Sequence, residues 1–168
     1  MEIITKFNIG TGDMLPALME EVTREKFSAL VSTGTIEKYI DDKFDRKVLM
    51  ADLNNIANQV LVVYVDNKPA GYAHITAKGQ KPEVLGSKRG IRLAEFGILQ
   101  QYNEDAVRLS LFEKCMLVTK SYDGVWINEY AESPLISFFE SKGFVPQDES
   151  FGLEGLPLPA KCLVKLRV

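Results

Sequence analysis

Histidine and cysteine, the usual ligands of zinc, are scarce in this sequence. One histidine, His74, and two cysteines, Cys115 and Cys162, are spread over 168 residues. Structural zinc sites are typically built from four such side chains, so the sequence predicts no metal centre. Both cysteines lie in apolar surroundings, which favours two buried, reduced thiols over a disulfide.

An excess of positive charge is also missing. The chain has 20 Lys and Arg against 23 Asp and Glu, which gives a net charge of −3 and a pI near 5.3. A protein that grips a nucleic-acid backbone needs a basic surface, so we expect no nucleic-acid partner. Long apolar runs are absent from the N-terminus and elsewhere, which predicts no signal peptide, no membrane span and a cytoplasmic protein.

What remains is the pattern of one folded domain spanning residues 1–168. Apolar residues make up 46% and charged residues 26%, a balance that is typical of a globular core. No repeat or linker divides the chain. Hydrophobic periodicity predicts strands at residues 2–9, 59–65, 70–77, 91–99 and 124–130, followed by a terminal pair of extended segments. It predicts helices that begin near residues 13, 35, 45, 106 and 134.

Local signals mark where these helices start and stop. Side chains that can cap a helix N-terminus are Asp13, Thr35, Asp45, Asn103 and Ser133. Gly34 is expected to end the first helical region. Gly143 is the natural left-handed residue after the last helix.

The order of the elements predicts the sheet. The two strands within residues 59–77 form a hairpin and are therefore antiparallel. The later strand–helix–strand unit requires a parallel crossover. We therefore expect an α/β (α+β) fold with a mixed, mainly antiparallel, twisted sheet of six to seven strands flanked by helices.

Three segments resemble the GNAT N-acetyltransferases. Residues 138–144, Phe-Phe-Glu-Ser-Lys-Gly-Phe, are similar to the family's recurrent Phe-Tyr-Glu-Lys-x-Gly-Phe. Residues 98–102 resemble the end of the central strand before the CoA loop, and residues 60–76 resemble the second and third strands. The order and spacing of these segments carry the resemblance over nearly the whole chain. An unrelated mixed α/β fold is the alternative.

The resemblance implies an acetyl-CoA-dependent N-acetyltransferase. Such an enzyme passes an acetyl group to a primary amine of a small molecule or peptide by direct attack, with acetyl-CoA as cosubstrate. The alternative is a catalytically impaired GNAT-like domain that binds a partner or a ligand other than CoA. The terminal strands could pair between subunits, which would give a homodimer.

Glu95 and Tyr130 are the catalytic candidates. Glu95 lies in the central strand, near where family members often carry a general base, although alternation also allows an exposed strand residue. Tyr130, with Glu129 beside it, ends the next strand, where the cleft opens in this fold, and either could act on a substrate or a thiol. Both are equally well interpreted as ordinary strand-end residues. His74 lies in an apolar strand, which favours a packed or surface-facing side chain over a proton shuttle.

The resemblance also implies a set of cofactor contacts. In the family, a glycine-rich turn that begins with Arg or Gln presents free N–H groups at a helix N-terminus to the CoA pyrophosphate. The residues implied here are Phe96, Ile98, Asn103, Glu104, Asp105, Ala106, Val107, Arg108 and Phe139.

This turn departs from the family pattern. Asn103 stands where the family has Arg or Gln, and Glu104 and Ala106 fall at glycine-type positions. Two like charges at ~4 Å in a dielectric of ~20 repel by about 4 kcal/mol, so the carboxylates of Glu104 and Asp105 oppose a bound phosphate. They suit a self-capped helix equally well. Both interpretations stay open, because Arg108, Lys88, Arg89 or Arg92 could offset the acidic charge from nearby.

Phe139 departs from the pattern as well. It replaces the tyrosine that in the family protonates the leaving thiolate.

Overall fold

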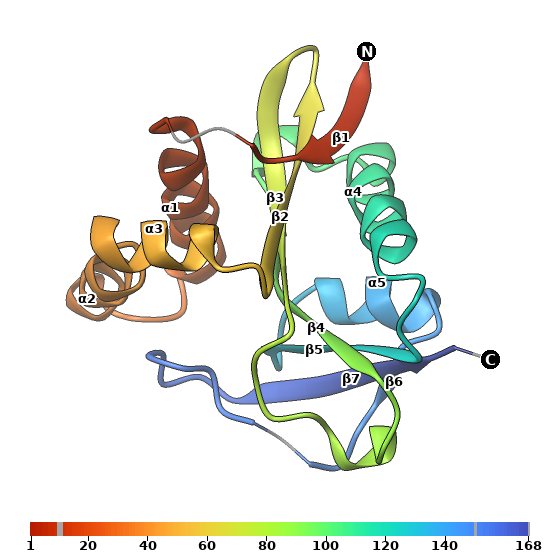
Figure 1. Ribbon diagram of the computed structural model, residues 1–168. Helices are drawn as coiled ribbons and strands as arrows, with labels where there is room; N and C mark the ends of the chain where they lie inside the picture. The colour runs from red at the N-terminus through yellow and green to blue at the C-terminus, as the bar shows by residue number, and fades with distance from the viewer. Residues whose placement is uncertain (10–11, 150, 168) are drawn as a thin grey trace.

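The computed structural model describes residues 1–9, 12–149 and 151–167. Its strands form one seven-stranded sheet in the order β1-β2-β3-β4-β5-β7-β6 (Figure 1). The β4–β5 pair is parallel and the other pairs are antiparallel. This confirms the predicted mixed, mainly antiparallel sheet. The strands are β1 (Ile3–Phe7), β2 (Asn58–Val65), β3 (Lys68–Thr76), β4 (Gly90–Ile98), β5 (Gly124–Tyr130), β6 (Val145–Pro146) and β7 (Ala160–Leu166).

Helices cover both faces of this sheet. Figure 1 shows one group of helices on one face and a second group on the other. The first group is α1 (Met14–Phe27), α2 (Thr33–Lys43) and α3 (Arg46–Asn54), and the second is α4 (Asp105–Val118) and α5 (Leu135–Ser141). Two short 3-10 turns, Glu83–Leu85 and Gln100–Tyr102, precede β4 and α4. The helix α4 connects the parallel strands β4 and β5.

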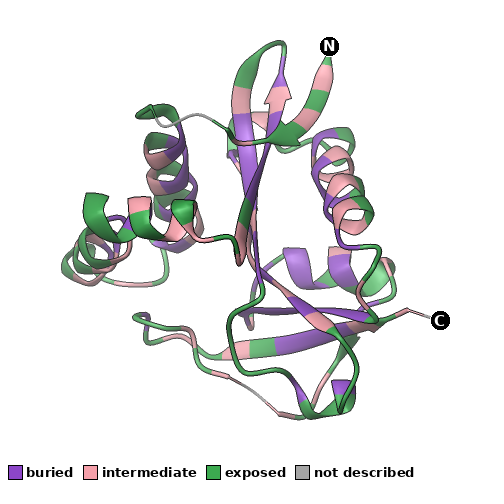
Figure 2. Cartoon of the chain, viewed as in Figure 1, coloured by how far each residue is buried: buried purple, intermediate pink, exposed green. Residues whose placement is uncertain are grey.

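The sheet is buried from both sides, as the purple strands of Figure 2 show. Along β2, Leu61 and Val63 enter the core beneath α4 and α5. Val60 and Val62 enter the core beneath α1, α2 and α3. Because a strand turns alternate side chains to opposite faces, a strand covered on both faces reads as a continuous apolar run.

Several predicted helix ends are confirmed. Asp45 caps α3, since its Oδ1 accepts the N–H of Lys47 at 3.1 Å. Gly143 has a φ of +93°, and the next N–H, that of Phe144, donates to the carbonyl of Phe139 at 3.1 Å. The Oγ of Ser133 accepts the N–H of Leu135 at 3.1 Å, at the start of α5.

Of the other predicted caps, Thr35 and Asn103 are wrong, and Asp13 has the predicted N-cap position without a capping hydrogen bond. Ser32 caps α2 in place of Thr35, whose N–H it accepts at 3.2 Å, and Gly34 lies inside this helix rather than ending one. Asp13 occupies the N-cap position of α1, but its carboxylate instead accepts from the Arg46 guanidinium at 2.7 Å. At α4 the N-cap residue is Glu104 and not Asn103. In all three places the helix still starts within two residues of the predicted position.

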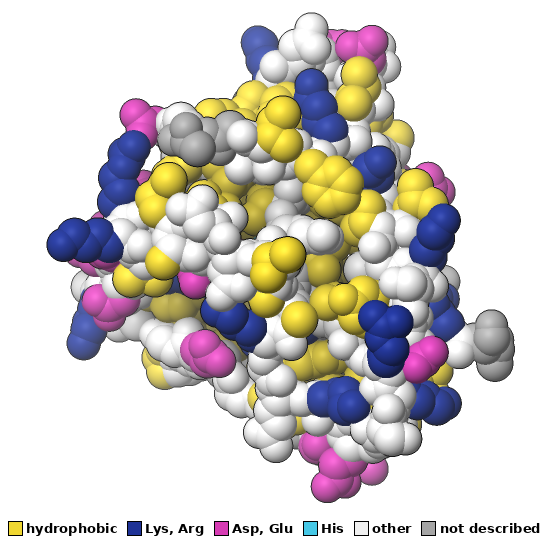
Figure 3. Space-filling view, in the orientation of Figure 1, with side chains coloured by type: hydrophobic (Ala, Val, Ile, Leu, Met, Phe, Trp, Pro, Cys, Tyr) yellow, Lys and Arg dark blue, Asp and Glu magenta, His cyan; other side chains and the backbone are white. Residues whose placement is uncertain are grey.

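The terminal strand β7 is an inner strand of the sheet. It pairs with β5 from Gly124↔Leu166 to Tyr130↔Ala160 and with β6 at Val145↔Val164. In the described ranges, no helix is long and apolar enough to cross a membrane. On the face drawn in Figure 3, basic and acidic side chains are interspersed around the periphery.

Candidate active site

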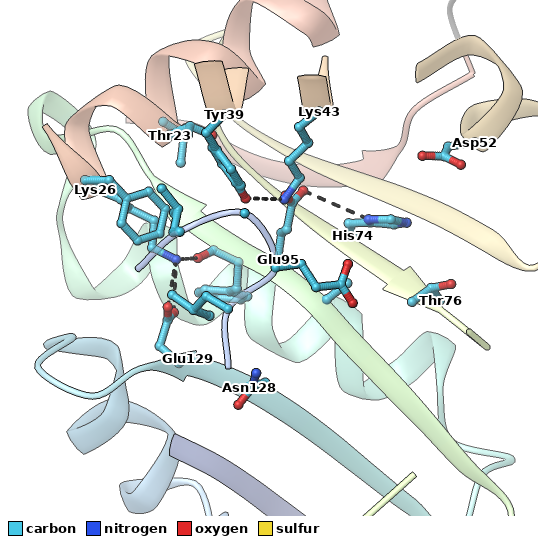
Figure 4. Close-up of a pocket in the computed structure, with 18 of the residues that line it drawn as sticks. Thr23, Lys26, Tyr39, Lys43, Asp52, His74, Thr76, Glu95, Asn128 and Glu129 are labelled. Atoms are coloured by element: carbon cyan, nitrogen blue, oxygen red, sulfur yellow. Dashed lines mark hydrogen bonds and ion pairs between the residues drawn. The ribbon is translucent and has the colours of Figure 1, made fainter. Parts of the chain in front are cut away.

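The strands β4 and β5 run together only briefly. They pair from Gly90↔Gly124 to Arg92↔Trp126, beyond which the described residues of the two strands no longer pair. A cavity of about 730 Å³ lies at this divergence, on the face covered by α1, α2 and α3. Side chains from these helices and from β3, β4 and β5 line it (Figure 4).

Glu95 reaches the cavity because β4 carries a bulge. The register of β4 against β3 shifts by one residue, which leaves Ala94 as the extra residue. Before the bulge Leu93 faces the α4/α5 core, and after it Phe96 does. A bulge changes the parity of a strand, so Glu95 turns to the cavity, where its side chain is 15% exposed. The alternative of an exposed strand residue is therefore wrong.

Three polar groups surround the Glu95 carboxylate. The Lys43 ammonium forms an ion pair with it, and the Tyr72 hydroxyl donates to Oε2 at 3.1 Å. The Nδ1 of His74 lies 4.0 Å from the same oxygen. Burial is the largest single effect and acts to raise the pKa of Glu95, but the charge of Lys43, the nearby His74 and the hydrogen bonds from Lys43 and Tyr72 together outweigh it, so the pKa lies below its ordinary value.

His74 also lines the cavity, rather than packing in the core or facing solvent. It lies opposite Glu95 in the β3–β4 register. Its Nε2 lies 3.0 Å from Oδ1 of Asn58. Because a carbonyl oxygen accepts, Nε2 carries the hydrogen and Nδ1 keeps its lone pair. Burial holds the pKa of His74 below its ordinary value, although the charge of Glu95 acts to raise it.

A second ion pair bridges the two separated strands (Figure 4). The Lys26 ammonium from α1 donates to Oε2 of Glu129 in β5 at 3.0 Å and to the carbonyl of Phe96 in β4 at 3.1 Å. The Glu129 side chain is only 5% exposed. Sequence reasoning missed Lys26. The sequence signal that could have identified Lys26 is its position next to Phe27, on the apolar side of α1.

Tyr130 has a different position from the one expected. Its ring packs against Phe27, with centroids 5.3 Å apart, in the core beneath the first three helices. Its backbone N–H donates to Oε1 of Glu129 at 3.1 Å. Tyr130 is not among the described residues that line the cavity. The structure therefore does not bring it together with Glu95, and it supports Glu129 instead.

Known structures share this arrangement of strands and helices. PaiA N-acetyltransferase from Thermoplasma acidophilum, solved in complex with coenzyme A, superposes with a TM-score of 0.79 at 14% identity, over 99% of this chain and 100% of that one. The GCN5-related N-acetyltransferase from Rhodopseudomonas palustris gives 0.71 at 14% identity, over 99% and 97%. The chain has the GNAT fold. The resemblance to the GNAT N-acetyltransferases seen in the sequence is confirmed for the fold.

More distant activities occur on the same fold. FeeM, an N-acyl amino acid synthase from uncultured soil microbes, superposes with a TM-score of 0.69 at 10% identity, over 98% of this chain and 91% of that one. No protein-family model matches the sequence, and no curated protein matches it. Since a fold carries many functions, activity has to be argued from the site.

In the GNAT fold, the expected CoA loop falls at the start of α4. Asn103 precedes the helix, and its N–H donates to the carbonyl of Gln100. Glu104 is the N-cap residue, but its side chain makes no capping bond. The self-capped helix is therefore wrong, and none of the side chains that the structure describes caps the first N–H groups of α4.

One of the two acidic side chains of this turn is paired with a cation. Asp105 is 97% exposed, and its carboxylate accepts from the Arg108 guanidinium at 2.7 Å. That guanidinium lies over the ring of Phe138, 4.7 Å from the centroid. Arg108 thus offsets one of the two acids, as the sequence suggested. Ala106 is exposed beside Asp105 in this first turn.

The remaining predicted cofactor residues belong to the core. Phe96, Val107 and Phe139 are buried beneath α4 and α5, with the rings of Phe96 and Phe139 5.3 Å apart. Ile98 is half-buried at the edge of the same cluster. Their side chains pack against one another, so any contact with a cofactor would be made by backbone groups.

The two cysteines are free and buried. Burial raises the pKa of Cys162 to about 11 and that of Cys115 further. A thiol with such a pKa is not a nucleophile near neutral pH. Among the described residues, no group of three or more His, Cys, Asp or Glu side chains could hold a metal ion.

Proposed function

We propose that the protein is an acetyl-CoA-dependent N-acetyltransferase that acts on a primary amine of a small molecule or peptide. The proposal rests on the pair formed by Glu95 and His74 inside a cavity that reaches the β4–β5 divergence. In this fold the divergence gives a thioester from one face of the sheet access to an amine on the other. PaiA, which has the same fold, was solved in complex with coenzyme A.

The pair supplies the base that acetyl transfer needs. An attacking amine has to lose a proton, and neutral His74 presents Nδ1 to the cavity to receive it. The Glu95 carboxylate, 4.0 Å away, stabilises the resulting imidazolium. The new C–N bond forms as the C–S bond breaks, and the thiolate leaves with the electron pair of that bond. Direct attack fits the absence of a reactive thiol, since Cys115 and Cys162 are buried.

The start of α4 supports a site for the CoA phosphates. Uncapped N–H groups and the positive end of a helix dipole attract phosphate, and Arg108 binds one of the two nearby acids. The leaving thiolate still needs a proton, which Phe139 cannot give. We infer that the Lys26 ammonium at the divergence is the donor in place of the family's tyrosine.

A second candidate is a catalytically impaired GNAT-fold domain that binds a partner or a ligand other than CoA. The acidic pair Glu104 and Asp105 at the expected phosphate site favours it, as does the buried Phe139. Release of free CoA discriminates the two candidates.

The test is thiol release from acetyl-CoA in the presence of a panel of primary amines. Removing a general base typically costs about 10²-fold or more in rate, so we expect His74→Asn and Glu95→Gln to lower kcat by about that factor. Glu113→Gln, an exposed change on α4, is the matched control and should leave kcat unchanged. No release above the uncatalysed rate with any amine would reject the enzyme and favour the second candidate.

A further inference from the structure

Arg92 in the wall of the cavity is a half-buried cation with no acidic partner among the described residues, whereas the lysines there are either paired or exposed. Lys26 and Lys43 are each paired with a glutamate. The side chain of Arg92, which lines the same cavity from β4, makes no ion pair or hydrogen bond to any residue that the structure describes. Its Nε is buried without an acceptor. A buried N–H group without an acceptor is costly, which points to a ligand that pairs with this guanidinium.

The guanidinium of Arg92 is held in place by an aromatic ring. It lies over the indole of Trp126, 5.1 Å from the ring centroid. Trp126 is buried at 4% exposure and faces Arg92 in the β4–β5 register. A guanidinium stacked on a ring leaves its edge free, and that edge matches the two oxygens of a carboxylate.

The distance from Arg92 to the proposed base suits a small acceptor. In the β3–β4 register Arg92 lies opposite Thr76, and Glu95 lies opposite His74. Thr76 and His74 are two residues apart on one face of β3, which is about 7 Å along a strand. The charge of Arg92 acts on the pKa of His74, as does that of Asp52. A single small ligand can therefore place an anionic group at Arg92 and an amine at His74, with only a few bonds between the two groups.

We propose that the acceptor is an amine that also carries a carboxylate, of which an amino acid is the simplest case. Its carboxylate pairs with the guanidinium of Arg92, and its amine lies at the Glu95–His74 pair. This inference rests on the proposed function, because it assigns the substrate class of the same site.

The test measures binding without an acyl donor, by calorimetry on the full chain. The twenty L-amino acids are titrated, and each one that binds is compared with the amine left after removal of its carboxylate. A hydrogen-bonded charge pair is worth about 1.5–3 kcal/mol, or tenfold and more in affinity. We expect the decarboxylated amine to bind at least about tenfold more weakly.

Variants locate the effect at Arg92. Arg92→Met should weaken binding of the amino acid by the same factor and leave binding of the decarboxylated amine unchanged. Arg92→Lys should bind the amino acid with an affinity between those of Arg92→Met and the unaltered protein. The matched control is Arg89→Met, because Arg89 also lies over an aromatic ring, that of Tyr122 at 4.9 Å, but does not line the cavity. It should bind as the unaltered protein does.

Three results would overturn the inference: equal affinity for the decarboxylated amine, unchanged affinity in Arg92→Met, or no binding of any amino acid at about 10 mM, roughly a −2.7 kcal/mol interaction. Failure of the proposed function is distinguishable. If the protein binds amino acids through Arg92 but releases no CoA from acetyl-CoA, the ligand class proposed here is supported and the acetyltransferase activity is rejected.

Discussion

At the scale of the residue, His74 and Glu95 depend on each other. They lie opposite one another on β3 and β4, with Nδ1 of His74 4.0 Å from Oε2 of Glu95. Burial disfavours the charged imidazole, and the carboxylate favours it. Burial prevails, so the imidazole is neutral at pH 7 and can accept a proton.

We predict that the pKa of His74 lies below 6.5, because burial is the larger effect. NMR titration measures this directly, since the chain has one histidine. Glu95→Gln should lower the pKa further by removing the charge that raises it. A pKa at or above the ordinary value, or a rise in Glu95→Gln, would contradict the arrangement.

The lowered pKa of folded His74 also predicts how the stability of the protein depends on pH. As the pH falls below about 6.5, the unfolded chain binds a proton that folded His74 does not yet bind. The free energy of unfolding should therefore decrease from there down to the lower, folded pKa of His74. Urea unfolding at several pH values should show this decrease, and His74→Gln should remove the part of it that lies in this window. An unchanged slope in the variant would contradict it.

At the scale of the element, Lys26 links α1 to β4 and β5 at the point where these two strands no longer pair. It bonds Glu129 in β5 and the carbonyl of Phe96 in β4. Close packing holds the same helix against β4: a Cβ on Gly97 would lie 2.5 Å from Cγ1 of Val22. Both contacts set the position of α1 over the cavity.

Breaking the bridge should destabilise the protein. Lys26→Met leaves Glu129 buried and unpaired, which typically costs about 3 kcal/mol. Lys26→Met combined with Glu129→Leu should recover most of this loss, because no buried charge remains. Urea unfolding measures the cycle, with Lys47→Met, an exposed change on α3, as the control. Additive single effects would show that the two residues are not coupled.

Gly97→Ala tests the packing of α1. The new methyl group clashes with a β-branched side chain that has little freedom, so we expect a loss of about 1–3 kcal/mol. Val22→Ala in the same chain should restore part of it by making room. Gly12→Ala, where nothing lies within 4 Å, is the control in the same thermal unfolding measurement. A stable Gly97→Ala variant would contradict the close approach.

At the scale of the whole molecule, the sheet was predictable and the site only partly so. Alternating and continuous apolar runs gave the strands, since burial of one or both faces leaves a readable pattern. The bulge at Ala94 left no such signal, and it decides which way Glu95 points. The partners of Glu95 and Glu129, Lys43 and Lys26, come from helices distant in sequence. Periodicity therefore could not place them.

The most direct test of the acyltransferase assignment is calorimetric titration with acetyl-CoA at low salt, with CoA alongside. The acidic side chains of Glu104 and Asp105 at the start of α4 oppose a bound phosphate. The uncapped N–H groups of α4 and the Arg108–Asp105 pair predict a micromolar dissociation constant for acetyl-CoA. No heat and no thermal stabilisation at millimolar acetyl-CoA would contradict the assignment.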